Sequence, residues 1–485
     1  MDELPLLDAA SLKQHGRRPP VPFAVALGDG RRLVARRLLR VLPGKRIVAE
    51  AELEGETVLA KLFIGRGATR RWQRERDGLA ALRDAAIPTP DLIATARIDH
   101  GGHALLTRFL DPARTLAQAL ADPATGSGTN AARALLESAF TTLGRLHQAG
   151  LVHDDLHLGN FLYHAGAVHV LDGDAVRAPG PGRTLEPATA GRNLALLLAQ
   201  LPAEWEARED ELLAAYRAGG PPVPDRSRLR AEVTRLRHWR VDTFLAKTVR
   251  DCTLFSVRRS ARRFVALVRD EAERLAPILA APDRAIESAR LLKAGRTATV
   301  ALLEPPEDGE RTAPLVIKRY NRKNLVHALS RLWRPSRAWH SWREGHRLAF
   351  LGIATPAPLA FIEERFGPLR GRAWLVTEHC PGPDLLQHLD PDRPPPEAEA
   401  RALTTLFAAL VRERISHGDL KASNLLWHAQ RLFVIDLDAM TQHRSPERFA
   451  RHWRRDRARL LRNWPAGSAL HAWLDAHLPD APPPT

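Results

Sequence analysis

The chain has 485 residues, with 72 lysines and arginines against 56 aspartates and glutamates, a formal net charge of +16 and two cysteines. This length allows two or three domains with full hydrophobic cores. Two thiols far apart in sequence exclude a disulfide framework and a zinc-cysteine site, and no apolar run approaches the ~20 residues that cross a bilayer. The acidic first residues do not form a secretory signal, so we expect a cytoplasmic protein.

The first half begins with strands and continues with helices. Residues 1–20 are polar and flanked by proline, and we expect a loose arm there. Lys61 lies near the end of an apolar run that predicts a strand, and a helix is expected to stop before Ile87-Pro88-Thr89-Pro90. The expected elements are strands at 23–27, 33–35, 38–42, 47–53, 57–63 and 104–107, and helices at 71–84, 115–120, 131–149, 192–216 and 227–247.

The second half repeats this order. Lys318 again lies at a strand end, and Ile353-Ala354-Thr355-Pro356 echoes the earlier proline break. Residues 252–268 fit either a basic helix or a hairpin that mirrors residues 23–35, and we favour the hairpin. The other expected elements are strands at 314–318 and 374–377, and helices at 341–351 and 397–414. The expected division is a first domain at 21–244, a second at 245–478 and a frayed proline-rich tail at 479–485.

One motif occurs once in each half. The segment His153–Asn160 is followed by Asp172, and His417–Asn424 is followed by Asp436. In both copies an Asp precedes the Asn by five residues (160 − 155 and 424 − 419) and the later Asp by 17 (172 − 155 and 436 − 419). Because the internal spacing is identical, we infer a duplication. The fold class expected is α+β, with two tandem protein-kinase-like domains, each a small antiparallel-sheet N-lobe with one helix and a mostly helical C-lobe.

These residue types at these spacings suit phosphoryl transfer from ATP, which needs positioning and neutralisation of phosphate charge. A strand lysine paired with a helix glutamate can hold the α- and β-phosphates, an aspartate can orient the acceptor hydroxyl, and an Asn with a later Asp can hold Mg²⁺. The candidates are Lys61 with Glu75 and Lys318 with Glu344 for the nucleotide, Asp155 and Asp419 for catalysis, and Asn160 with Asp172 and Asn424 with Asp436 for the metal. The alternative interpretation is that Lys61 and Lys318 are ordinary edge-strand lysines, and that Glu75 and Glu344 are solvated helix carboxylates.

The sequence resembles the Kdo/WaaP-like lipopolysaccharide kinases. The resemblance is carried in the second half by Ile317–Tyr320, Arg331–Arg343, Gly352–Pro356, His417–Lys421, Ile435–Asp438 and Arg455–Leu460. It is carried more briefly in the first half by Ile87–Pro90, His153–Asn160 and Leu171–Asp174. It implies a kinase that uses ATP and Mg²⁺ to phosphorylate Kdo or heptose in the lipopolysaccharide inner core. The implied partner is a lipopolysaccharide core or lipid A-core acceptor, with peripheral contact at the anionic inner membrane face.

Departures from protein kinases favour a small or carbohydrate acceptor. Asp154 and Gly418 replace the Arg that would sense an activation-loop phosphate, and Asp174 and Asp438 end the metal motif where Gly is usual. No Ala-Pro-Glu follows, and neither half has a Gly-x-Gly-x-x-Gly loop. The segment that precedes the second helix is rich in Arg and Trp, which suits an anionic glycolipid or leaflet or, equally, a packed aromatic cluster.

The two copies differ beside the catalytic aspartate. Lys421 lies two residues after Asp419 and provides a fixed positive charge, whereas His157 holds this place in the first copy and is only partly charged near neutral pH. We expect two competent sites and, if only one works, the second, for Lys421 as a catalytic residue. The alternatives are an active kinase with a regulatory pseudokinase, a scaffold, and a kinase for small molecules or proteins. Binding to nucleic acid is suggested only by the positive net charge, and no nucleic-acid recognition motif supports it.

Overall fold

The computed structural model describes residues 4–122, 129–178, 185–295, 297–305, 313–321, 335–367 and 369–480, except the side chains of 203 and 204. The chain forms two compact units, Met1–Arg237 and His238–Thr485, called the first and second units below. They divide within helix α7 (Arg226–Lys247), the same helix that contains the division expected after residue 244. No helix among the described residues is long and apolar enough to cross a membrane.

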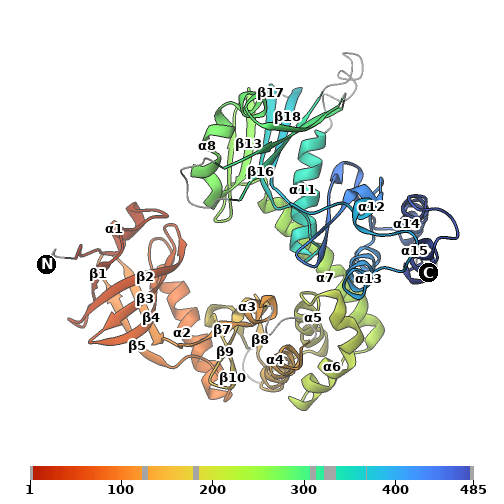
Figure 1. The fold of residues 1–485 in the computed structure, drawn as a ribbon. Coiled ribbons are helices and arrows are strands. Elements are labelled where there is room, and N and C mark those ends of the chain that lie inside the picture. Colours follow the sequence, from red (N-terminus) through yellow and green to blue (C-terminus); the bar gives the residue numbers. More distant parts are fainter. Residues whose placement is uncertain are drawn as a thin grey trace. The chain divides into compact units, whose positions relative to one another are not determined.

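The first unit begins with a six-stranded antiparallel sheet, red to orange in Figure 1, in the order β1-β2-β3-β4-β6-β5. Leu27, just after β1, bridges to Ile98 of β5, so the two sheet edges meet and enclose an apolar interior. Helix α2 packs on the sheet through Phe63, Ala68 and Leu79. The elements are α1 (Ala9–Gln14), β1 (Phe23–Ala26), β2 (Arg32–Leu42), β3 (Arg46–Leu53), β4 (Glu56–Phe63), α2 (Ala68–Asp84), β5 (Leu92–Ile98) and β6 (Gly102–Arg108).

The N-terminal arm is part of this core, and the expectation of a loose arm at 1–20 is wrong for its described residues. Leu7 donates its N–H to Ala24 O at 2.8 Å, and Ala24 donates to Pro5 O at 2.9 Å. Leu7 and Leu12 are buried inside the curled sheet. Apolar residues spaced along α1 therefore hold the arm, although its overall composition is polar.

The rest of the first unit is mostly helical, built around a core to which α4 contributes the largest share of buried side chains. Its elements are β7 (Arg114–Thr115), α3 (Leu116–Ala121), α4 (Asn130–Gln148), β8 (Val152–His153), β9 (Phe161–His164), β10 (Ala167–Val170), β11 (Val176–Arg177), α5 (Pro187–Leu198), α6 (Glu209–Ala218) and the first part of α7.

The second unit has a seven-stranded sheet in the order β12-β13-β17-β18-β16-β15-β14. Helices α8 and α9 pack on one face, and α11 packs on the other through Ala338 and Trp342. Its upper elements are β12 (Phe255–Arg259), β13 (Arg263–Val268), α8 (Ala272–Ala280), α9 (Pro282–Glu287), β14 (Arg290–Ala294), β15 (Ala298–Leu303), β16 (Leu315–Tyr320), α11 (Arg337–Phe350), β17 (Pro358–Phe366) and β18 (Leu369–Glu378).

The hairpin expected at 252–268 is present as β12–β13, paired from Phe255–Val268 to Arg259–Phe264. Its place differs from the expected mirror of 23–35. In the first unit the extra strand β1 lies beside β2, whereas β13 pairs with β17 at the opposite edge of the corresponding sheet. Strand periodicity predicts a hairpin but does not say which sheet edge receives it.

A second helical lobe follows, blue in Figure 1. Its elements are α12 (Leu385–His388), α13 (Glu397–Arg412), β19 (Ile415–Ser416), β20 (Leu425–His428), β21 (Arg431–Val434), β22 (Thr441–Gln442), α14 (Pro446–Leu461) and α15 (Ala469–His477). Each unit is thus a sheet that packs against a long helix, α2 or α11, followed by a mostly helical lobe, as expected of two tandem kinase-like domains. The second sheet carries α8 and α9 in addition to the one helix expected. Of the expected tail, residues 481–485 lie outside the described residues.

Helix α2 touches the metal-motif segment through glycine. A Cβ on Gly78 would lie 1.8 Å from Gly173 O, so backbone meets backbone here. We therefore expect Gly78→Ala to lower the free energy of unfolding of the first unit by about 1–3 kcal/mol, although alanine normally favours a helix by about 1 kcal/mol.

Calorimetric unfolding of the full chain measures this effect. The matched control is Asp77→Ala, an exposed position on the same helix, which should change the free energy by less than about 0.5 kcal/mol. Stabilisation by Gly78→Ala would contradict the close contact.

Candidate active site

In the first unit, Lys61 of β4 lies at the centre of a buried ion cluster. Its Nζ is 2.5 Å from Glu75 Oε1 of α2 and 2.7 Å from Asp172 Oδ1. Glu75 is fully buried and also accepts the N–H groups of Gly173 and Asp174, each at 3.2 Å. Helix, sheet and metal-motif segment are therefore joined through one carboxylate.

Charge pairing outweighs burial in this cluster. Burial opposes the charge on Lys61, but Glu75 and Asp172 raise the pKa of its ammonium. Burial would raise the pKa of Asp172, but Lys61 and Arg46 hold it well below its usual range. Asp174 differs: burial and the nearby Glu75 raise the pKa of its carboxyl. Lys61 and Asp172 are thus a fixed ion pair at neutral pH.

Asp172 and Asp436 both adopt left-handed backbone conformations, with φ of 59° and 58°. A non-glycine residue rarely adopts this conformation, and such residues concentrate at functional sites. In each unit it lets the chain turn directly after a strand while the carboxylate contacts the sheet lysine. The equivalent contact in the second unit joins Lys318 Nζ to Asp436 Oδ1 at 2.6 Å.

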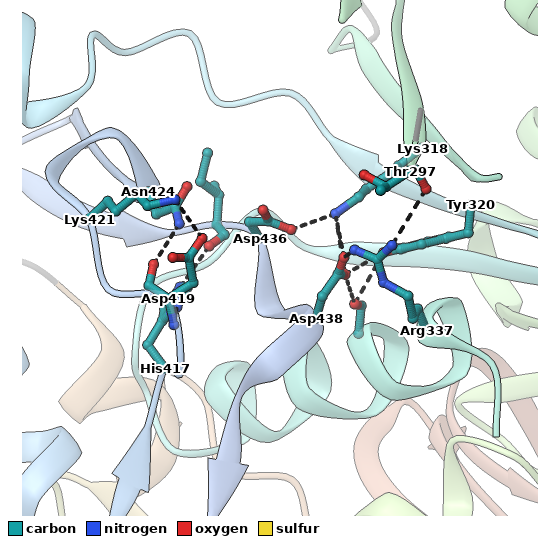
Figure 2. Close-up of polar contacts among 12 residues, drawn as sticks. Thr297, Lys318, Tyr320, Arg337, His417, Asp419, Lys421, Asn424, Asp436 and Asp438 are labelled. Carbon is teal, nitrogen blue, oxygen red and sulfur yellow. Dashed lines mark hydrogen bonds and ion pairs between the residues drawn. The ribbon is translucent and has the colours of Figure 1, made fainter. Parts of the chain in front are cut away.

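The second unit corrects the expected partner of its lysine. Lys318 lies 3.2 Å from both carboxylate oxygens of Asp438, whereas Glu344 forms an ion pair with Arg347 at 2.8 Å (Figure 2 shows the Lys318 contacts). Asp438 also accepts hydrogen bonds from Ser341 at 2.7 Å and Tyr320 at 3.0 Å, and it contacts Arg337. The carboxylate that fixes the lysine thus comes from the metal motif instead of the helix.

The alignment of the two helices explains why Glu344 is not the partner of Lys318. Glu75 lies 12 residues before Ile87 (87 − 75), and the same count back from Ile353 gives Ser341 (353 − 12). Glu344 is one turn further along α11. Ser341 is therefore the residue of α11 that is equivalent to Glu75. Because serine has no carboxylate, Lys318 pairs with Asp438.

Asp438 is ionised in this setting. Burial would raise the pKa of its carboxyl, but Lys318, the Ser341 hydroxyl and Arg337 together lower it. Burial and the nearby Asp438 raise the pKa of Tyr320 well above its usual value, so its hydroxyl stays protonated and donates. Arg337 also donates to Thr297 O at 3.4 Å, in the turn between β14 and β15.

Both catalytic-loop motifs are built in the same way. Asn160 and Asn424 each donate Nδ2 to the backbone oxygen of the loop aspartate, Asp155 or Asp419, at 2.8 Å. His153 and His417 each place Nε2 2.9 Å from the backbone oxygen before the metal-motif aspartate. The 17-residue spacing thus corresponds to two segments tied together by a histidine.

The surroundings of the loop aspartates differ. Asp419 is held by Lys421 Nζ at 2.9 Å and by Arg459 Nη1 at 2.7 Å, and its side chain is 35% exposed. Asp155 is 76% exposed, and His157 Nε2 lies 3.9 Å from it. Arg459 comes from α14 and also donates to Gly418 O at 2.8 Å. Reasoning from sequence assigned no role to Arg459, because α14 lies far from the loop in the chain.

A polar side chain from the next helix fixes each loop backbone. Asp456 of α14 accepts the N–H of His417 at 2.6 Å and of Gly418 at 3.1 Å. In the first unit Asn193 of α5 takes this place and donates Nδ2 to His153 O at 2.9 Å. Three residues further along each helix, Arg459 corresponds to Leu196, so the first unit has no cation at this position.

Comparison with known proteins finds a matching family. The sequence pattern of the lipopolysaccharide kinase (Kdo/WaaP) family matches residues 62–177 and 308–473, which together exceed half of the chain. The chain belongs to this family. The match falls once in each unit and includes both loop aspartates and both metal-motif aspartates. No curated protein sequence matches the chain.

A solved structure titled "WaaP in complex with acyl carrier protein" aligns at 21% identity over 42% of this chain and 88% of that chain, with a TM-score of 0.32. Membership of the Kdo/WaaP family makes the protein a phosphotransferase with an alcohol group as acceptor and implies use of ATP. It also confirms the expected resemblance.

A buried histidine supports the loop of the first kinase unit. His147 contacts Asn193 Oδ1 through Nε2 at 3.0 Å and the Tyr216 hydroxyl through Nδ1 at 2.7 Å. Burial lowers the pKa of His147 to about 4. The imidazole of His147 therefore binds a proton near pH 6.5 in the unfolded chain but only near pH 4 in the folded unit. The contribution of His147 to the free energy of unfolding is fully present above pH 6.5 and decreases as the pH falls to about 4.

We expect acidification over this range to remove up to about 3 kcal/mol of the first unit's stability through His147 alone. His147→Gln keeps hydrogen-bonding groups but does not titrate. It should therefore reduce the slope of the unfolding free energy against pH by the amount that corresponds to about one bound proton. Urea unfolding at a series of pH values measures the slope. An unchanged slope in the variant would contradict the neutral histidine.

Proposed function

We propose that the protein transfers the γ-phosphate of ATP to a heptose hydroxyl of the lipopolysaccharide inner core, with Mg²⁺, and that the second unit carries out the transfer. The observation that carries this assignment is the placement of Lys421 and Arg459 on Asp419. This placement distinguishes the second unit from the first, whereas the family match includes both units.

Asp419 is suited to receive the acceptor's proton. A loop aspartate within reach of the hydroxyl orients it and accepts its proton as the phosphoryl group is transferred. Arg459 fixes one carboxylate oxygen through Oδ1 and the neighbouring backbone through Gly418 O. Lys421 is 48% exposed, so its ammonium is accessible to phosphate oxygens that gain charge in the transition state.

The residues expected to hold Mg²⁺ fit that metal. Asn424 donates Nδ2 to Asp419 O, so its side-chain oxygen is the atom that remains for a cation, and Asp436 supplies a carboxylate. Mg²⁺ prefers hard oxygen ligands, usually from one or two protein side chains together with substrate phosphates and water. No group of three or more His, Cys, Asp and Glu side chains that could hold a metal ion occurs in the described part of the chain. The bound ion would neutralise phosphate charge.

Lys318 is proposed to hold the α- and β-phosphates, with Asp438 in the role first expected of Glu344. In the first unit Lys61 and Glu75 have the corresponding places, and Asn160 and Asp172 those of the metal ligands. The ion pair of Lys318 with Asp436 keeps its ammonium next to the proposed metal position.

A carbohydrate acceptor is favoured over a protein. Helix α14 begins at Pro446, ten residues after Asp436 (446 − 436), so the chain has little room for the activation segment on which protein kinases place a peptide. Heptose is proposed over Kdo from the resemblance alone. The net charge of +16 and the exposed arginines favour an anionic glycolipid acceptor and the anionic inner membrane face. Of the Arg- and Trp-rich segment, Arg331, Trp333 and Arg334 lie outside the described residues.

The first unit is proposed to support the second. Two competent sites were expected from the duplicated spacing, but Asp155 has His157 at 3.9 Å and Leu196 in place of an arginine. This observation favours the alternative of one active kinase with a regulatory pseudokinase.

Phosphorylation of purified core oligosaccharide by the full chain, followed by mass spectrometry, tests the function. We expect Asp419→Asn to lower the rate of phosphate incorporation by about 10²–10⁴-fold, because the proton acceptor is lost. Asp155→Asn should leave the rate within about twofold, because the first unit does not transfer. Equal loss in both variants would contradict the assignment of transfer to the second unit.

Arg459→Ala should lower kcat about 10–100-fold with little change in the KM for ATP, because it acts on the orientation of Asp419. Arg459→Lys should restore part of the loss through its charge. Arg451→Ala, an exposed position on the same helix, is the matched control. Steady-state kinetics separate the two constants, and a rise in KM at constant kcat would show that Arg459 only binds nucleotide.

A further inference from the structure

Arg46, the first residue of β3, is a buried arginine beside the ion cluster of the first unit. Its side chain is 9% exposed, and Nη1 lies 3.8 Å from Glu75 Oε2 and 3.7 Å from Asp174 Oδ2. Its Nε is buried and lacks a hydrogen-bond partner among the described residues. Both ion-pair distances exceed the usual hydrogen-bond range of about 2.7–3.2 Å. A buried guanidinium with an unused donor is costly unless another acceptor arrives.

The fold itself does not require this arginine. Val48 pairs with Lys61 in the first sheet, and Val300 pairs with Lys318 in the second. Two residues earlier on each strand, Arg46 therefore corresponds to Ala298. The second unit builds its lysine-aspartate cluster with a methyl group at this place and neutralises Asp438 with Arg337 instead. The buried arginine is thus a feature of the first unit.

The position of Arg46 suits an oxyanion. It follows the Pro43-Gly44-Lys45 turn, in the place where kinases carry a glycine-rich loop over the phosphates. Arg71 of α2 holds this turn by donating to Lys45 O at 3.2 Å and to Ile64 O at 2.9 Å. A guanidinium presents a planar fork of donors that matches phosphate oxygens. With Lys61 next to it, Arg46 gives the first unit two cations at this place, where the second unit has Lys318 and, at the position of Arg46, Ala298.

We propose that the first unit binds the diphosphate of a nucleotide through Arg46 and Lys61 and retains it without transferring phosphate. The first unit then senses nucleotide, and the second unit uses it. The claim that transfer belongs to the second unit rests on the proposed function, whereas nucleotide binding through Arg46 does not. Binding and transfer are therefore tested separately.

Isothermal titration of the full chain carrying Lys318→Met tests the binding. This change removes the phosphate-binding ammonium of the second unit and keeps a side chain of similar length. We expect one ADP to bind per chain. Adding Arg46→Ala should weaken ADP binding at least about tenfold and change adenosine binding less than about twofold, because adenosine has no phosphate.

Arg37→Ala is the matched control. Arg37 lies on the adjacent strand β2, is 64% exposed and pairs with Glu50, so its loss removes the same charge without touching the cluster, and ADP affinity should stay unchanged. The proposal is overturned if the Lys318→Met chain binds no ADP or if Arg46→Ala leaves ADP affinity unchanged. It is also overturned if Arg46→Ala weakens adenosine as much as ADP, which would indicate a purely structural role.

Retention without transfer has its own readout. The Lys318→Met chain is incubated with ATP and core oligosaccharide, and the bound nucleotide is then released and identified by chromatography. Intact ATP is the expected result. Conversion of ATP to ADP at the wild-type rate would contradict the claim that the first unit retains nucleotide without transferring phosphate. The titrations test nucleotide binding through Arg46 independently of this result.

Discussion

The ion pair between a sheet lysine and the aspartate that follows a motif strand is the constraint on which each unit depends. Lys61 with Asp172 and Lys318 with Asp436 join the sheet to the helical lobe at 2.7 and 2.6 Å. Each aspartate needs a left-handed backbone to make this contact, and such strain persists only where the surrounding structure holds it. The pair also keeps a cation beside the proposed metal position.

Around this shared pair the two units satisfy their charges differently. The first unit uses Glu75 from the helix and adds the incompletely bonded Arg46. The second uses Asp438, which Ser341, Tyr320 and Arg337 hold in place. It also places two further cations on Asp419. Removing one member of such a buried network leaves another charge unpaired, so divergence requires several coupled changes. The differences are therefore better explained by separate roles than by drift of a redundant copy.

Much of this could be predicted from sequence, because the decisive features are local. The spacing of 5 and 17 residues predicts the loop, the strand and the turn in which Asp419, Asn424 and Asp436 lie, and the family match covers all three residues. Features set by tertiary packing could not be predicted. Arg459 reaches Asp419 from a helix 40 residues away, Arg46 is oriented by burial, and the edge that receives β12–β13 is a property of the sheet. The prediction of Glu344 as the partner of Lys318 rests on the helix carboxylate of the kinase pattern, whereas the partner in the structure is Asp438, two residues after Asp436.

The most direct test of the central claim is the phosphate count of core oligosaccharide from cells that lack this protein, measured by mass spectrometry after complementation. The account predicts fewer phosphates without the protein, full recovery with Asp155→Ala and no recovery with Asp419→Ala. Recovery with Asp419→Ala, or a phosphate count that does not depend on the protein, would contradict it.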